Sequence, residues 1–155
     1  MESPGRLVLV CGLPGAGKTT LARRLAGELP AVRFCPDEWL AALAADVFDE
    51  DLRDRLERLL WTQAKELLAL GVTVILEYGF WGRDERDAKR EEAAALGVTV
   101  ELRYLDLPFD ELWRRVDARN AHGPVVIPLE ALKEYAAVFQ PPTPEELALF
   151  ASDSA

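Results

Sequence analysis

The sequence predicts an α/β fold in which a parallel β-sheet carries helices on both faces. Short apolar runs alternate along the chain with longer segments of helical periodicity, which is the pattern of βαβ units. The runs that predict strands are residues 6–11, 31–35, 72–76 and 98–105. A glycine-rich loop also joins the first strand to the first helix. In such folds the functional site lies beyond the carboxyl ends of the strands.

The glycine-rich loop at residues 12–19, GLPGAGKT, fits the pattern G-x-x-x-x-G-K-[ST] and lies between a strand and a helix, as the motif requires. Glycines let successive N–H groups point at one anion, and the amino end of the next helix faces the same anion. Lys18 can reach the outer phosphates of ATP, and the Thr19 hydroxyl can coordinate Mg²⁺. The alternative is a glycine turn that binds nothing. The expected nucleotide-binding residues here are Gly12, Pro14, Gly15, Ala16, Gly17, Lys18, Thr19 and Thr20.

Composition limits the classes of protein. The chain has 155 residues, half of them hydrophobic, and a formal net charge of −9, so we expect one domain over residues 1–155. The acidic balance disfavours nucleic acid as a partner. The two cysteines, Cys11 and Cys35, lack metal-ligand spacing and are interpreted as buried hydrophobic residues. Residues 1–6 do not resemble a signal peptide and no apolar run would span a bilayer, so we expect a cytoplasmic protein without a membrane partner.

The remaining segments follow in order. Helices are predicted from residue 18 to 29, from 36 to 45, from 52 to the helix-ending Gly71, from 83 to 96, from 108 through Arg119, and from 128 to 139. Residues 46–51 form an acidic loop, alternating polar residues make 98–105 an edge strand, and residues 143–146 form a capping box. We expect about four strands in the order 2-3-1-4, as in P-loop NTPases, with a helical lid around residues 109–128.

Two carboxylates follow predicted strands and are candidates for chemistry. Asp37, after the second strand, is expected to accept the proton of a substrate hydroxyl, with Glu38 as a weaker candidate for the same role. A helix N-cap is the alternative for Asp37. Glu77 ends an apolar strand, where a buried carboxylate needs a cation or hydrogen-bond donors. It is therefore predicted to serve Mg²⁺ with Thr19 or to bind substrate, and a solvated strand end is its alternative.

Arginines and aromatic residues complete the candidate set. Arg115 and Arg119 lie one helical turn apart and suit a lid over phosphates, unless they only form a solvated basic face. The aromatic residues that follow the second and third strands could wall a substrate pocket or belong to the core. The candidates of this kind are Trp39, Tyr78, Phe80 and Trp81. Arg86 opposes the dipole of its helix, which suggests an anionic or carbonyl partner. If the acidic residues of 46–51 border the pocket, they favour a cationic substrate.

These motifs resemble those of the small P-loop kinases, in particular the ATP-binding kinases grouped with zeta toxin, chloramphenicol phosphotransferase and polynucleotide kinase. The resemblance is carried by residues 12–19, 34–39, 75–81 and 115–120. It implies that Lys18 and Thr19 serve ATP and Mg²⁺, that Asp37 is the base and that Arg119 is a lid arginine. Polynucleotide kinases commonly place an arginine where this chain has Leu40, and many relatives have aspartate where it has Glu77.

The leading hypothesis is an ATP-dependent kinase that transfers the γ-phosphoryl group to a hydroxyl of a small molecule. By the resemblance alone, the acceptor is a natural product or an antibiotic. A 5′-hydroxyl polynucleotide kinase is the second hypothesis, which Leu40 and the acidic composition disfavour. The third is a nucleotide-binding switch or toxin-like module without a small-molecule acceptor.

Overall fold

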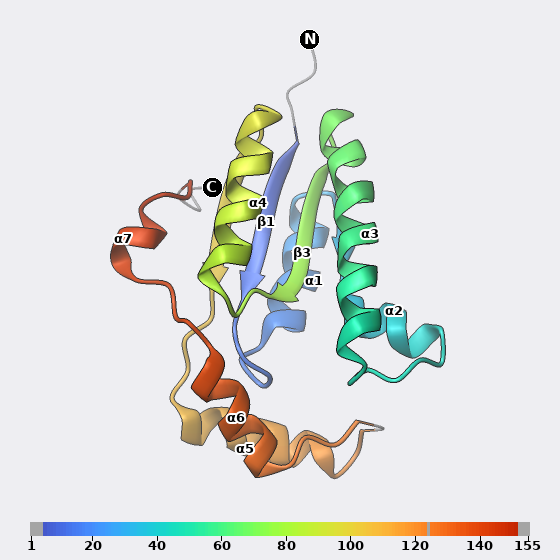
Figure 1. Cartoon of the computed structure of the whole chain (residues 1–155), viewed down its shortest axis with the longest axis vertical. Helices are drawn as coiled ribbons and strands as arrows, with labels where there is room; N and C mark the ends of the chain where they lie inside the picture. The colour runs from blue at the N-terminus through green and yellow to red at the C-terminus, as the bar shows by residue number, and fades with distance from the viewer. Residues whose placement is uncertain (1–4, 124, 152–155) are drawn as a thin grey trace.

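A computed structural model describes residues 5–123 and 125–151 of the chain. Its sheet has four parallel strands in the order β2-β3-β1-β4, as the sequence predicts. The strands are β1 (Arg6–Cys11), β2 (Ala31–Phe34), β3 (Thr73–Gly79) and β4 (Thr99–Tyr104). β1 and β3 lie at the centre, and their carboxyl ends point to the same end of the molecule (Figure 1).

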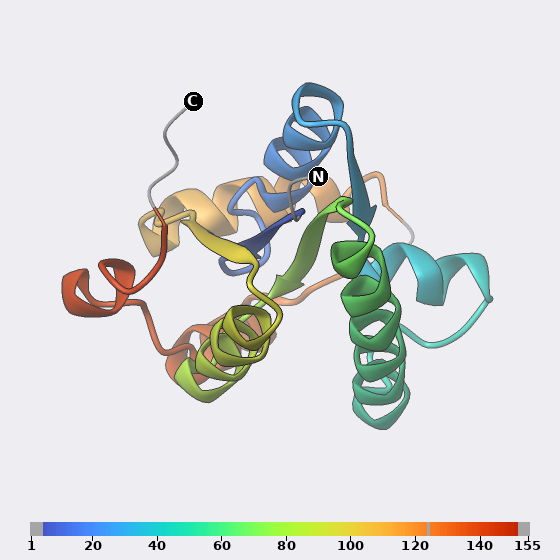
Figure 2. The same cartoon turned by 90° about the horizontal axis from the view of Figure 1, so that it is seen from above.

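Helices cover both faces of this sheet. They are α1 (Lys18–Glu28), α2 (Pro36–Ala42), α3 (Glu50–Ala69), α4 (Arg83–Ala95), α5 (Phe109–Asn120), α6 (Leu129–Val138) and α7 (Pro144–Leu147). α1 packs on one face, whereas α3 and α4 pack on the other (Figure 2). α5 and α6 lie beyond the carboxyl ends of the central strands (Figure 1). No helix in the described ranges combines the length and the apolar character needed to cross a membrane.

The central strand β1 supplies both halves of the core. Residues 7–11 are fully buried, and their side chains alternate between the faces because successive residues of a strand point to opposite sides. Leu7, Leu9 and Cys11 join the core under α3 and α4, whereas Val8 and Val10 pack with α1. Cys11 and Cys35 are buried free thiols, as predicted. A third apolar cluster packs the P-loop against α5 and α6 through Ala16, Leu112, Val116 and Leu132.

Two helix boundaries and one strand differ from the prediction. α2 ends at Ala42 instead of continuing to residue 45, and Ala44 has a φ of 57°, which a right-handed helix does not allow. α3 begins at Glu50, inside the predicted acidic loop, because the Asp49 carboxylate accepts the Leu52 N–H at 3.0 Å and caps the helix. β3 continues to Gly79, so Glu77 lies within the strand instead of after it.

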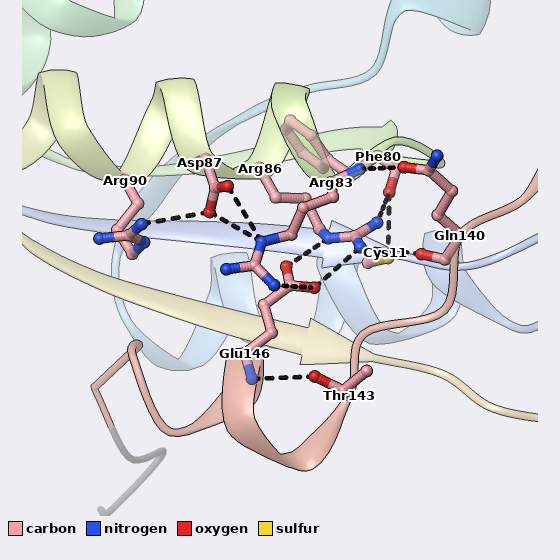
Figure 3. A network of polar contacts seen from close by, with 9 residues as sticks. All are labelled: Cys11, Phe80, Arg83, Arg86, Asp87, Arg90, Gln140, Thr143 and Glu146. Carbon is pink, nitrogen blue, oxygen red and sulfur yellow. Dashed lines mark hydrogen bonds and ion pairs between the residues drawn. The ribbon is translucent and has the colours of Figure 1, made fainter.

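The C-terminal segment closes the free edge of β4. Ala151 N–H donates to the Val100 carbonyl at 2.8 Å, and a single parallel bridge joins Ala151 to Glu101. The described C-terminal segment therefore pairs with β4 at one position and does not form a fifth strand. The Thr143 hydroxyl accepts the Glu146 N–H at 3.1 Å, which confirms half of the predicted capping box. The Glu146 carboxylate does not complete the box, because it pairs with Arg86 of α4 (Figure 3).

Candidate active site

The P-loop has the backbone of an anion cradle. Gly15 and Gly17 have φ values of 87° and 97°, which L-residues with a Cβ rarely adopt. A Cβ on Gly15 would also lie 2.9 Å from the Leu112 carbonyl oxygen, so this glycine lets the loop pack directly on α5. The loop is therefore held between the end of β1 and α5.

The amino end of α1 carries no competing negative charge. Its N-cap, Gly17, offers no side-chain acceptor, and its first turn contains no acidic residue. The other helices of the described chain each have an acidic residue in the first turn. The unpaired amides and positive dipole end of α1 are thus left free for an external anion, in the place where the motif predicts phosphate.

Lys18 is poised at the same loop. Its Nζ donates to the Leu13 carbonyl at 2.9 Å, which folds the side chain along the P-loop. Burial lowers the pKa of Lys18 to about 8, although the charges of Glu77 and Asp37 act in the opposite direction. A phosphate anion beside this ammonium would favour the charged form of Lys18 and raise its pKa again.

Glu77 is a buried carboxylate with three donors. Its Oε2 accepts the Thr19 hydroxyl at 2.5 Å and the Cys35 thiol at 3.4 Å, and its Oε1 pairs with Arg33 at 2.6 Å. The solvated strand end is therefore wrong for Glu77, which is 7% exposed. Arg33 was not expected in this role, since its position in β2 gives no motif to recognise.

The side-chain oxygens of Thr19 and Glu77 fit a magnesium site that is completed by the phosphates of a bound nucleotide. Mg²⁺ prefers oxygen donors and usually takes only one or two from the protein, with phosphates and water supplying the rest. A hydroxyl and a carboxylate oxygen in direct contact provide this pair. The described residues contain no cluster of three or more acidic, histidine or cysteine ligands, so an all-protein metal cage is not formed there.

Asp37 lies on the first turn of α2 and bonds to Arg53 of α3. It is not the N-cap, because that position belongs to Cys35 and Pro36 is the first helical residue. The Arg53 guanidinium also donates to the Val47 carbonyl at 3.0 Å, which fixes the segment between α2 and α3. Asp37 is therefore held by a neighbouring helix and is largely exposed to the cavity rather than used as a cap.

One cavity of about 680 Å³ brings the P-loop and Asp37 together. The predicted residues that line it are Pro14, Gly15, Gly17, Lys18, Thr19, Thr20, Asp37, Glu77, Tyr78, Trp81, Arg115 and Arg119. Further lining residues were missed by the sequence analysis, among them Phe48, Arg53, Glu57, Glu85 and Tyr135. They come from α3, α4, α6 and the segment before α3, and no local motif connects them. Of the acidic segment 46–51, the cavity is lined only by Val47, Phe48 and Glu50.

Six predicted candidates do not line this cavity, and two of them, Gly12 and Ala16, are buried within the P-loop itself. Glu38 and Trp39 border a separate shallow pocket of about 290 Å³, where Glu38 pairs with Arg33 at 2.7 Å. Phe80 is 2% exposed and belongs to the core. Arg86 is fully buried and its guanidinium pairs with Glu146 (Figure 3), so the predicted substrate contact is wrong for this residue.

Arg115 and Arg119 both line the cavity that contains the P-loop residues. Arg115 lies so near the loop that a Cβ built on Gly17 would be 3.6 Å from its Nη1. Its Nε also pairs with Glu111 at 3.0 Å on the exposed side of α5, so the charge of Arg115 is shared with a surface ion pair. Arg119 lines the cavity and is close enough to Lys18 for its charge to lower the pKa of that lysine. Both side chains thus lie in the same cavity as Lys18.

The sheet order, the P-loop and the uncapped α1 define a P-loop domain of the kinase type. A family model described as AAA domain (AAA_33) matches residues 7–142, and the chain belongs to this family of P-loop kinases. No curated protein matches the sequence.

Several solved kinase structures are similar to the chain. A sugar kinase from Janibacter sp. HTCC2649 is 28% identical with a TM-score of 0.67, covering 92% of this chain and 82% of that one. The APS kinase of Mycobacterium tuberculosis, solved with AMPPNP and APS, is 21% identical with a TM-score of 0.62, covering 87% and 97%. A chain of the Pnkp1/Rnl/Hen1 RNA repair complex is 21% identical with a TM-score of 0.71, and this protein covers 45% of its length. The last two likenesses concern the fold.

Proposed function

We propose that the protein is an ATP-dependent kinase that transfers the γ-phosphoryl group to a hydroxyl of a small molecule. One observation carries the proposal: a single cavity is lined both by residues of the P-loop, namely Pro14, Gly15, Gly17, Lys18 and Thr19, and by Asp37. A nucleotide-binding switch has no evident use for a carboxylate at that position. Kinase structures among the similar folds support phosphotransfer as the class of activity.

The residues of the P-loop end would hold and neutralise the triphosphate. The α1 amides, Lys18 and the two lid arginines face the region where the β- and γ-phosphates would lie. The side-chain oxygens of Thr19 and Glu77 would hold Mg²⁺, and the bound ion would supply neutralisation of phosphate charge. Arg33 holds Glu77 in place from the adjacent strand.

Asp37 would act on the acceptor. The acceptor hydroxyl gives its proton to the Asp37 carboxylate while its oxygen forms a bond to the γ-phosphorus. The bond between the γ-phosphorus and the β–γ bridging oxygen breaks, and ADP leaves with that oxygen. Arg53 would orient the Asp37 carboxylate from α3. In phosphoryl transfer, positioning and electrostatic stabilisation provide most of the catalysis.

A screen of hydroxylated small molecules with γ-labelled ATP tests the proposal. Asp37→Asn should lower the rate of transfer by about 10²- to 10⁴-fold, the range for a general base, and leave nucleotide affinity nearly unchanged. Asp84→Asn is the matched control, because Asp84 is the second residue of α4 as Asp37 is of α2 and does not line the cavity. Transfer that is equally fast in the Asp37→Asn and wild-type proteins would exclude this mechanism.

A nucleic-acid acceptor is the less favoured alternative. Polynucleotide kinases commonly have an arginine at the position of Leu40. Here Leu40 is fully buried in the core, so this position offers no cation to a substrate phosphate. Labelling of 5′-hydroxyl oligonucleotides in the same assay distinguishes the two, and we expect no incorporation.

A further inference from the structure

We propose that the phosphate acceptor is a cation, namely an alcohol that carries a protonated amine on an apolar or aromatic body. The inference rests on the proposed kinase function, because it describes the acceptor end of the same cavity. It is argued below from the charges, the free carboxylates and the aromatic walls of that end.

The charges of the cavity are separated into two ends. Lys18, Arg115 and Arg119 stand around the P-loop, where a triphosphate would bring the opposite charge. Away from the loop, α3 and α4 contribute three glutamates that line the cavity, Glu50, Glu57 and Glu85. Arg53 also lines this second end, but its guanidinium is already bound to Asp37, so an anionic acceptor would meet three glutamates and little available counter-charge.

These three glutamates have no cationic partner of their own. No side chain within residues 5–123 and 125–151 forms an ion pair or a hydrogen bond with their carboxylates. Arg53 is the arginine at this end, and its guanidinium is bound to Asp37 and the Val47 carbonyl. Lys89 of α4 lies near Glu57 but does not line the cavity, and its ammonium sits 5.0 Å from the centre of the Trp61 ring.

Glu57 shows the effect of this unbalanced charge. Burial, with the nearby charge of Glu85, raises the pKa of Glu57 to about 7. A carboxylate is costly in such surroundings unless a positive group enters. An ammonium bound between α3 and α4 would supply that group, and two carboxylates could share its donors.

Aromatic side chains provide the second, independent indication. Phe48, Tyr78, Trp81 and Tyr135 line the cavity, and Phe48 is 51% exposed. The polar atoms of two of them are already used, because the Tyr78 hydroxyl donates to the Glu57 carbonyl at 2.9 Å and Trp81 Nε1 to the Gly12 carbonyl at 3.2 Å. Tyr78 also stacks on Phe80 and Trp81 packs against Tyr135, so these rings form an apolar wall of the cavity beside the half-exposed Phe48. Such a wall suits an apolar ligand body, and aromatic rings also attract ammonium groups.

Matched sets of alcohols test the inference. We would use 2-amino-1-phenylethanol, its N-acetyl derivative and mandelate, which differ mainly in charge, within a panel of larger amino alcohols that are each paired with their N-acetyl forms. Transfer from ATP should occur to amines, and N-acetylation should lower kcat/KM by about 10- to 150-fold, the effect of losing a hydrogen-bonded charge. Equal or faster transfer to the neutral or anionic members would overturn it.

Variants of the glutamates provide a second readout. Glu57→Gln and Glu85→Gln should each raise KM for an amine acceptor with little change in nucleotide affinity. Glu66→Gln is the matched control, since Glu66 lies on the exposed side of α3 outside the cavity. If these two variants shift KM no more than the control does, the glutamates do not recognise the acceptor and the inference is wrong.

Nucleotide titration separates this inference from the proposed function. A protein that binds no ATP contradicts the kinase itself. A protein that binds ATP but transfers to neutral alcohols, or that binds no member of the amine panel in the presence of a non-hydrolysable ATP analogue, contradicts only the cationic acceptor.

Discussion

Arg86 and Glu146 form a fully buried ion pair between helices that are 60 residues apart in the sequence. Arg86 Nε lies 2.6 Å from Glu146 Oε2, and Nη2 lies 2.9 Å from Oε1, so the contact is bidentate (Figure 3). The same guanidinium donates to the carbonyls of Phe80 and Gln140. It therefore fastens the C-terminal segment to the turn after β3, next to the start of the P-loop.

We expect Glu146→Ala to lower the free energy of unfolding by about 3–5 kcal/mol, because it leaves the Arg86 charge buried without its counter-ion. Urea denaturation measures this change. Arg58→Ala breaks an exposed pair with Asp54 and should cost less than about 1 kcal/mol. Similar losses of unfolding free energy in both variants would show that the buried ion pair contributes no more to stability than the exposed one.

Glu77→Gln should raise the Mg²⁺ concentration needed for nucleotide binding and turnover by at least the roughly 10- to 100-fold seen when a group that only supports a metal ligand is changed, because Glu77 is itself a proposed ligand. The physical reason is that the Thr19 hydroxyl and the Glu77 carboxylate meet at 2.5 Å, where the metal is expected. Magnesium titrations of ATP binding by wild type and variant provide the measurement. An unchanged magnesium requirement would place the metal elsewhere.

Nucleotide binding should take up protons in alkaline solution. The pKa of Lys18 is lowered to about 8 in the free protein, so its ammonium is increasingly lost as the pH rises through 8. A bound triphosphate restores the charged form, and affinity should therefore fall above this pH while each binding event draws in up to one proton. Calorimetry at pH 8.5 in buffers of different ionisation enthalpy detects the uptake. Lys18→Met should abolish it, and wild-type binding without uptake would contradict the assignment.

Glu57→Gln should stabilise the protein in neutral and alkaline solution. Because the pKa of Glu57 is raised from 4.5 to about 7, the folded state holds a proton that the unfolded state releases, and stability falls as the pH rises through this range. Glu85 and Asp54 raise this pKa, whereas Arg53 and Lys89 lower it. The gain should be on the order of 1–3 kcal/mol at pH 8 and near zero at pH 4.

Denaturation of wild type and Glu57→Gln at both pH values gives the comparison. Glu66→Gln, on the exposed side of the same helix, should leave stability unchanged at either pH. A destabilised Glu57→Gln variant at pH 8 would mean that the carboxylate already has a favourable partner.

Local patterns predicted the parts of the molecule that depend on neighbouring residues in the chain. The P-loop, the four strands and most helices follow from spacing and from glycine and proline positions, and Lys18 and Thr19 are found where the motif puts them. The order of the strands agreed with that expected for P-loop NTPases.

Several side chains reach the site only through tertiary packing, and the sequence could not predict them. Arg33, Arg53 and Glu57 reach the site from β2 and α3, and nothing near them in the sequence marks that role. Arg86 was misassigned because its helical position suggested a ligand, whereas its partner, Glu146, lies in the last helix. Trp39 was misplaced because its ring lies near Phe34 and borders the separate pocket that Arg33 and Glu38 also line.

The account as a whole depends on whether the P-loop binds a triphosphate with its metal. Isothermal titration of the wild-type protein with ATP, in the presence and absence of Mg²⁺, tests this most directly, with Lys18→Ala as the comparison. We predict saturable, magnesium-strengthened binding that is severely weakened in the variant. Titrations of the wild-type protein that show no binding of ATP or GTP under either condition would contradict the account.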